Sequence, residues 1–383
     1  MRSRFPGRLL IAAGALLSLL IHAFGRRKPA IPRRILVLHH LLLGDTIMLT
    51  PLVKKLRTRF PGARIVMTCP VAFAGLFATR PYGLEVIPFD ERNVRTILDV
   101  WRQPRFDLTV IPAENRLSLL ARAIGSRWIV AFDGDRPAYK SWFVDELRPF
   151  PVSPMAWGDL VCMLVDGPAP ESYRPSEWMA PPATAPELPS EPYCVVHLGA
   201  SSVLRLWNPD RWVSIIDALE RRGLAVILSA GPKERHLIEQ VDPAQARTWF
   251  AGTLSLESLW HVLVRARLLV CLDTGVAHLG RVVGVPEVLI FGPGSAQLFG
   301  GGEFWRNMPD RKVFVPDFPC RNENLIFRRQ VPWAGHCGRP FGKCLDPLCM
   351  KAVTVNAVLG AIEASLDDDR ARSDERRSDN PDA

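Results

Sequence analysis

An aspartate follows the first short apolar run of the chain, at Gly44-Asp45. The run at 34–39 has the composition of a buried strand, and apolar residues at helical spacing follow at 46–60. In a parallel sheet, ligands bind beyond the carboxyl ends of the strands, and glycine allows a tight turn and a close backbone approach. With an ordinary pKa of about 4, Asp45 is ionised at neutral pH and can accept a proton. It can equally cap the following helix, so both roles stay open.

A second polar loop follows a later apolar run, at 193–198. This run ends in Gly-Ala-Ser-Ser, and Arg205 then precedes a helix that starts at Pro209. Small residues let an anionic ligand approach backbone N–H groups, and a guanidinium can neutralise a phosphate. Ser201 and Arg205 are therefore candidates for holding a phosphate. The alternative is a surface loop with a solvated arginine.

A third candidate site is the segment Leu-Asp-Thr-Gly-Val-Ala-His-Leu at 272–279, again between a strand-like run and a helix. Thr274 and Gly275 supply a hydroxyl group and exposed N–H groups at the start of that helix, which suits a diphosphate. Asp273 and His278 can hydrogen-bond sugar hydroxyls or phosphate. A histidine on a short helix can also be a packed core residue.

These sites require strands that alternate with helices, and the hydrophobic pattern supplies them. Strands are predicted at 34–39, 64–69, 84–89, 107–111, 127–132, 193–198, 224–228, 267–272 and 288–291. Helices are predicted at 46–60, 73–78, 94–101, 116–124, 209–222, 256–264, 276–283 and 354–366. Such alternation indicates βαβ units and parallel sheets, the α/β class. No P-loop and no G-x-G-x-x-G motif follows the first strand, which disfavours a P-loop enzyme or a simple dinucleotide oxidoreductase.

A proline-rich segment divides the chain, since eight of the 25 residues at 168–192 are proline. We expect a linker there, between Rossmann-like domains at 33–167 and 193–366, with a cleft between the domains. The charged end at 367–383 has no apolar period and is predicted to be disordered.

The net charge of +9 belongs to the N-terminus. Residues 1–34 carry eight basic side chains and no acidic one, whereas the rest holds 40 basic and 39 acidic side chains. A nearly neutral body excludes a broad nucleic-acid footprint. The 16-residue apolar run at 9–24 would reach about 24 Å as a helix, short of a bilayer core of about 30 Å. We expect residues 1–32 to bind an anionic membrane surface; a cleaved signal or an ordinary core helix are alternatives.

Taken in order along the chain, these motifs resemble glycosyltransferase family 9, the bacterial lipopolysaccharide heptosyltransferase type. The similarity covers roughly residues 33–365. The matching segments are Gly44-Asp45 with the Thr50-Pro51 helix, Gly199-Ala-Ser201 with Arg205 and Trp207, Asp273-Thr274-Gly275 with His278, and Phe291-Gly292-Pro293.

The resemblance implies a GT-B type fold: two Rossmann-like domains whose parallel sheets face a central cleft, with no required metal and no cofactor. The N-terminal domain would hold a lipid-linked or glycan acceptor, and the C-terminal domain a nucleotide sugar, with ADP-heptose favoured. The enzyme would invert the anomeric centre. It would work in the cytoplasm, peripheral to or anchored at the inner face of the bacterial inner membrane.

The resemblance also assigns roles to individual residues. Asp45 matches the general base, beside Gly44 in the turn at the acceptor side. Arg205 falls where the family commonly has a lysine that supports the departing diphosphate. Donor binding is assigned to a set that shares the two C-terminal loops: Ser201, Asp273, Thr274, Gly275 and His278.

Two other functions remain open from the sequence. One is a nucleotide-sugar epimerase of the same two-domain shape, which would need no acceptor. The other is a non-catalytic protein that binds a nucleotide sugar without turnover.

The cysteines fall into two groups. Cys69, Cys162, Cys194 and Cys271 lie in apolar runs and are expected in the core. A C-terminal group, Cys320, Cys337, Cys344 and Cys349 with His336, lacks C-x-x-C spacing. We expect thiols there; a structural metal or disulfides are the alternatives.

Overall fold

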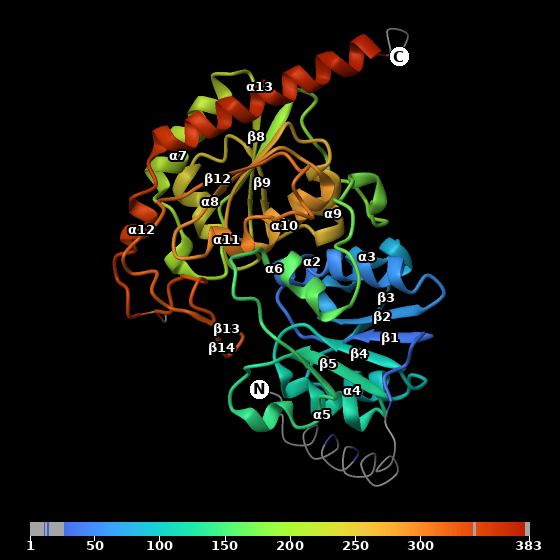
Figure 1. Cartoon of the computed structure of the whole chain (residues 1–383). Helices are drawn as coiled ribbons and strands as arrows, with labels where there is room; N and C mark the ends of the chain where they lie inside the picture. Colours follow the sequence, from blue (N-terminus) through green and yellow to red (C-terminus); the bar gives the residue numbers. More distant parts are fainter. Residues whose placement is uncertain (1–10, 12–13, 15–26, 340–341, 380–383) are drawn as a thin grey trace.

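The computed structural model describes residues 11, 14, 27–339 and 342–379, and it contains two six-stranded parallel sheets (Figure 1). The expected α/β class is confirmed. Most of the N-terminal segment at 1–32 lies outside the described residues. Within the described part of the chain, no helix is both long and apolar enough to cross a membrane.

The first sheet has the strand order β3-β2-β1-β4-β5-β6, with every neighbouring pair parallel. Its strands are β1 (Arg34–Val37), β2 (Arg64–Cys69), β3 (Glu85–Pro88), β4 (Leu108–Ile111), β5 (Trp128–Phe132) and β6 (Glu146–Arg148). The sequence predicted the first five. It missed β6, a three-residue edge strand with charged residues at both ends.

Helices cover both faces of this sheet (Figure 1). They are α2 (Leu43–Ile47), α3 (Thr50–Arg59), α4 (Val94–Trp101), α5 (Ser118–Ala123) and α6 (Trp157–Val161), with 3-10 turns η1 (Val71–Phe77), η2 (Pro81–Gly83), η3 (Asn115–Leu117), η4 (Ala138–Ser141) and η5 (Cys162–Leu164). The single helix predicted at 46–60 is wrong, because the structure divides it into α2 and α3. Pro51 lies in the first turn of α3, where its missing N–H costs nothing; inside a continuous helix it would break the hydrogen-bond ladder.

The second sheet has the order β12-β11-β10-β7-β8-β9 and is also parallel throughout. Its strands are β7 (Tyr193–His197), β8 (Ala225–Ala230), β9 (Thr248–Ala251), β10 (Leu268–Leu272), β11 (Glu287–Ile290) and β12 (Asp310–Val313). The helices beside it are α7 (Pro209–Glu220), α8 (Arg235–Val241), α9 (Leu256–Leu263), α10 (Gly275–Val283), α11 (Ala296–Phe299) and α12 (Leu348–Lys351), with η7 (Val203–Arg205). The sequence missed the edge strands β9 and β12.

The segment at 168–192 joins the two sheets and is packed against both of them. It forms one short turn, η6 (Pro175–Glu177). The hydroxyl of Tyr173 donates to the carbonyl of Val282 at 2.9 Å, and the indole of Trp178 donates to the carbonyl of Leu76 at 3.2 Å. Both aromatic side chains are buried, so this segment is fixed to both sheets.

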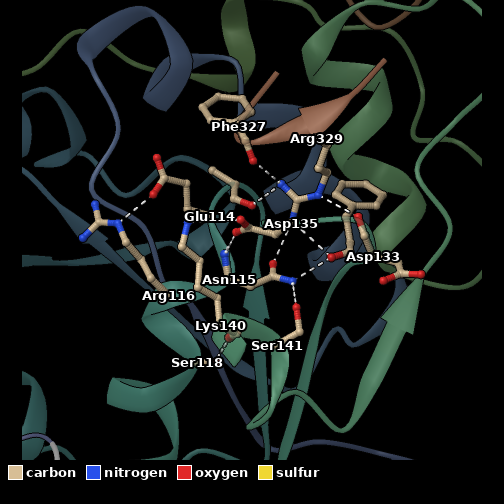
Figure 2. Close-up of polar contacts among 12 residues, drawn as sticks. Glu114, Asn115, Arg116, Ser118, Asp133, Asp135, Lys140, Ser141, Phe327 and Arg329 are labelled. Carbon is tan, nitrogen blue, oxygen red and sulfur yellow. Dashed lines mark hydrogen bonds and ion pairs between the residues drawn. The ribbon is translucent and has the colours of Figure 1, made fainter. Parts of the chain in front are cut away.

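A hairpin from the C-terminal half forms a second connection. It consists of β13 (Leu325–Ile326) and β14 (Arg329–Gln330). The guanidinium of Arg329 is buried among groups at the carboxyl ends of β4 and β5 (Figure 2). It donates to the carbonyl oxygens of Ala113 at 2.8 Å, Asp133 at 2.8 Å and Phe132 at 3.1 Å, to that of Phe327 in its own hairpin at 3.0 Å, and to Oδ1 of Asn115 at 2.8 Å.

The last helix, α13 (Val355–Asp379), continues well past residue 366, so the prediction of disorder was wrong for 367–379. Its first half buries Val358, Ile362 and Leu366 against the second sheet. Neither proline nor glycine follows Gly360 within the helix, and Asp369 pairs with Arg267 at 2.9 Å. Helix propensity and ion pairs thus extend α13 over 367–379, where the sequence has no apolar stripe. Residues 380–383 lie outside the described residues.

Candidate active site

A cavity of about 650 Å³ lies between the two halves. Its wall combines α2, the loops after β7 and β8, and the junction of β10 with α10. All eight residues that the sequence singled out line this one cavity: Gly44, Asp45, Ser201, Arg205, Asp273, Thr274, Gly275 and His278. The structure therefore brings the three predicted loops together, as the carboxyl-end rule for parallel sheets requires.

Two glycines allow α2 and α10 to approach closely across the domain boundary. A Cβ atom at Gly44 would lie 2.5 Å from Cδ2 of His278, and one at Gly275 would lie 2.8 Å from Cδ2 of Leu43. Real Cβ atoms do not come this close to other heavy atoms. Glycine at both positions thus brings the N-terminal turns of the two helices together, with Asp45 on one and His278 on the other.

Asp45 is the third residue of α2 and does not cap it. The N-cap is Leu42, and no side chain makes a capping hydrogen bond there. Burial raises the pKa of Asp45 to about 7, the charge of Asp273 adds to the rise, and Arg205 opposes it. The ordinary pKa expected from the sequence is therefore wrong, since the carboxyl group lies in the cavity wall, where it is poorly solvated, and is close to a second carboxylate. A pKa near neutrality suits a general base.

Arg205 is bound to Asp273 at the opposite wall. Its Nη1 donates to the backbone carbonyl of Asp273 at 2.7 Å and lies 3.5 Å from Oδ2 of the same residue. Burial raises the pKa of Asp273, whereas Arg205 and Arg281 lower it. Oδ2 of Asp273 accepts no hydrogen bond from the described residues. The arginine is thus not a freely solvated side chain, although about a third of it is exposed to the cavity.

The N-terminus of α10 opens into the cavity. Thr274 is its N-cap, and the hydroxyl of this residue accepts a hydrogen bond from the N–H of Val276 at 3.1 Å. The remaining free N–H groups and the helix dipole give this end positive character, which favours an anion. His278 is buried one turn further on. Its pKa lies well below the ordinary value because of burial and then the charges of Arg281 and Arg205, so the ring is neutral.

Glu234 is a cavity residue that the sequence analysis missed. Its carboxylate accepts hydrogen bonds from the N–H groups of Ala200 at 3.1 Å and Gly231 at 2.7 Å, which fixes the loops after β7 and β8 to each other. The sequence did carry a signal, because Gly231 directly follows β8, much as Gly199 closely follows β7. Another glycine, Gly294, packs behind Asp273: a Cβ atom on residue 294 would lie 2.1 Å from Oδ2 of Asp273.

The cysteines are all free thiols, and Cys69, Cys162, Cys194 and Cys271 are buried, as expected. Among the described residues, no group of three or more histidine, cysteine, aspartate or glutamate side chains is arranged to hold a metal ion. Cys349 is buried, whereas Cys320, Cys337 and Cys344 are partly exposed.

Two parallel α/β sheets with a cavity between them, lined by a carboxylate from one half and a helix N-terminus from the other, are the arrangement of the GT-B type fold. The model of glycosyltransferase family 9 (heptosyltransferase) matches residues 102–309, more than half of the chain. The chain belongs to this family. The resemblance inferred from the sequence is therefore confirmed, and the epimerase and non-catalytic alternatives are not favoured.

Individual relatives agree with this assignment. The lipopolysaccharide heptosyltransferase 1 of Pseudomonas aeruginosa is 28% identical over 359 residues, which span 87% of this chain and 98% of the relative. Two solved structures share the fold. The E. coli ADP-heptose lipopolysaccharide heptosyltransferase II has a TM-score of 0.66 at 16% identity, covering 88% of this chain and 99% of that one. The E. coli heptosyltransferase WaaC with ADP-2-deoxy-2-fluoro heptose has a TM-score of 0.61 at 16% identity, covering 86% and 99%.

Proposed function

We propose that this glycosyltransferase moves a heptose from ADP-heptose to a hydroxyl group of a lipopolysaccharide-type or related glycan acceptor, with inversion. The observation that carries the proposal is the single cavity in which Asp45 from one half faces Arg205 and the N-terminus of α10 from the other. The choice of heptose as the sugar and ADP as the nucleotide is supported by the relatives named above, which are heptosyltransferases, two of them named with ADP-heptose or an analogue. The half at 33–167 would hold the acceptor, and the half at 193–366 the donor.

Asp45 is the general base of the proposed reaction. It takes the proton of the acceptor hydroxyl, and the hydroxyl oxygen forms a bond to the anomeric carbon. The bond from that carbon to the diphosphate oxygen breaks, and ADP leaves with the electron pair. The raised pKa of Asp45 supports this role, because such a base is ionised in part at neutral pH and binds the proton more strongly than an ordinary carboxylate.

The donor diphosphate is assigned to the opposite wall. Arg205 and the N–H groups around Gly275 supply positive charge where negative charge develops on the leaving group. Asp273, Thr274 and His278 offer hydrogen bonds at the same junction, and Ser201 offers one from the loop after β7. These groups can stabilise ADP without a metal ion, and metal-independent transfer is part of the proposal.

The acceptor-binding half, together with the N-terminal segment at 1–32, is proposed to bind the membrane surface. A lipid-linked acceptor and the basic residues of the N-terminal segment would bring the enzyme to the anionic inner face of the bacterial inner membrane. Flotation with phosphatidylglycerol-containing vesicles tests this part: the full chain should float, and the chain without residues 1–32 should not. Equal partition of the two forms would refute it.

Transfer is tested with ADP-heptose and two purified lipopolysaccharide acceptors, one that lacks heptose and one that already carries it, following both ADP release and the mass of the glycan. The proposal expects ADP release that depends on acceptor and persists in excess EDTA. An isomerised donor in the absence of acceptor would indicate an epimerase. Binding of ADP-heptose with no product from either acceptor would indicate a non-catalytic protein, and a requirement for added metal would refute metal independence.

A further inference from the structure

Behind His278, helix α10 carries a buried charge that the proposed reaction does not use. Arg281 lies one turn after His278 and is only 1% exposed. Its Nη1 lies 3.1 Å from Nδ1 of the His278 ring. Its Nη2 lies 3.2 Å from Oε1 of Glu287 and 3.5 Å from Oδ2 of Asp310. A chain of polar contacts therefore leads from His278 at the cavity, through Arg281, to Glu287 and Asp310 in the last two strands of the second sheet.

The contact between Arg281 and the ring fixes which ring nitrogen carries the proton. Every nitrogen of a guanidinium is a donor and none is an acceptor. Nδ1 of His278 must therefore be the bare acceptor, and the proton of the neutral ring resides on Nε2. That edge of the ring faces α2, since a Cβ at Gly44 would lie 3.0 Å from Nε2. His278 also lines the cavity, beside Gly44 and Asp45 of α2.

The far end of Arg281 is held by carboxylates at the start of two adjacent strands. Glu287 begins β11 and Asp310 begins β12, and the two residues are register partners in the sheet. Asp310 is also 3.4 Å from the ammonium of Lys312. Gly280 leaves room for Glu287, because a Cβ there would lie 2.9 Å from Oε2. The guanidinium thus has a fixed orientation when it meets the ring.

We propose that Arg281 is a positioning residue, which holds His278 as the Nε2–H tautomer so that the ring donates a hydrogen bond to the donor diphosphate. This inference rests on the proposed function for the identity of the ligand, but the tautomer itself can be tested without any ligand. Arg281 does not touch the donor. Its effect on binding should therefore pass through His278.

The variants must not leave Glu287 as an unpaired buried carboxylate, because that could unfold the domain. We therefore combine Arg281→Met with Glu287→Gln, and Asp310 keeps Lys312 as its partner. Glu287→Gln alone is the matched control, since it retains the contact between Arg281 and the ring. Thermal melting of each purified variant confirms that the proteins compared are folded.

The first measurement is the ¹⁵N spectrum of the full chain labelled at histidine, with the His278 signals assigned from their absence in His278→Gln. The wild type and Glu287→Gln should show a protonated Nε2 and a bare Nδ1. The double variant should show a mixture of tautomers. A single Nε2–H tautomer that persists in the folded double variant would overturn the proposal.

The second measurement is calorimetric titration with ADP. The double variant should bind ADP about tenfold more weakly, as expected for one lost hydrogen bond to a charged group. When His278 is already glutamine, the same two changes should alter the Kd by less than about twofold. An equal loss in both backgrounds would show that Arg281 acts through its charge, and would overturn the proposal. If the wild type fails to bind ADP, the proposed function fails, and the tautomer spectrum alone decides the role of Arg281.

Discussion

The backbone of Gly44 lies directly against the imidazole of His278, so that a Cβ atom at residue 44 would approach Cδ2 of the ring to 2.5 Å. This contact joins the two halves at the catalytic cavity, since Gly44 belongs to α2 and His278 to α10. It also explains why the residue before Asp45 is a glycine, although the backbone there is ordinary helix. Here glycine provides space rather than conformational freedom.

Gly44→Ala should therefore destabilise the protein and impair its activity. An added methyl group must displace the His278 ring or α2, and overpacking of this kind typically costs about 1–3 kcal/mol. Denaturant unfolding measures the cost, and ADP titration reports the displaced ring. Gly62→Ala is the matched control, because its Cβ would meet nothing within 4 Å. Equal stability and ADP affinity in the two variants would contradict the tight contact.

Removal of Arg205 should reduce turnover far more than it weakens acceptor binding. Loss of one donor that stabilises developing charge typically costs about 10²–10³ in rate. Arg205→Lys should recover only part of the rate, because a lysine ammonium cannot reproduce the placement of the planar guanidinium, whose Nη1 now meets both the carbonyl oxygen and Oδ2 of Asp273. Arg306→Ala, on an exposed ion pair with Glu303, is the control and should leave kcat unchanged. A wild-type kcat in Arg205→Ala would return Arg205 to a merely structural role.

The fold was predictable where strands are buried on both faces. Central strands such as β1, β4, β7 and β10 are continuous apolar runs, which the sequence shows directly. In the two large sheets, the three missed strands, β6, β9 and β12, all lie at the edges, and the two-residue strands β13 and β14 of the hairpin were missed as well. These strands are short and carry charged or partly exposed residues, as in Asp-Arg-Lys-Val of β12, whereas the remaining edge strand, β3, was found from the apolar residues at 84–89.

The candidate site was predictable to the extent that glycine and polar residues lie between the end of a strand and the next helix. The position of Asp45 was found in this way, but its raised pKa was not, because it depends on burial and on Asp273, 228 positions away in the sequence. Arg281 and Arg329 were missed for a similar reason. Their roles come from partners in other elements, and local spacing carries no trace of these contacts.

The hairpin residue Arg329 should be required for docking of the β13–β14 hairpin onto the first sheet. Arg329→Met would leave the carbonyls of Ala113 and Asp133 without their donor, at about 1–3 kcal/mol for each unsatisfied buried group. Hydrogen–deuterium exchange should rise in both the hairpin and the segment after β4. Arg328→Met is the matched control, because this neighbouring side chain is exposed. Unchanged exchange in the folded Arg329→Met protein would show that the hairpin is held by other contacts.

The pH dependence of turnover tests Asp45 most directly. Burial and the charge of Asp273 raise the pKa of Asp45 to about 7, so its base form is lost as the pH falls through that value. For the wild type, kcat/KM should therefore rise with pH and level off above an inflection near 7. Asp45→Asn should lower turnover by about 10²–10⁴ and abolish this inflection, while ADP affinity is kept.

The raised pKa of Asp45 also means that the folded state loses stability as the pH rises from about 4 to about 7, because the carboxyl group must ionise where it is poorly solvated. Asp45→Asn cannot ionise and should melt at or above the wild-type temperature at pH 8. Near-wild-type turnover with the inflection intact would exclude Asp45 as the base, and a lower melting temperature at pH 8 would show that its burial is not costly.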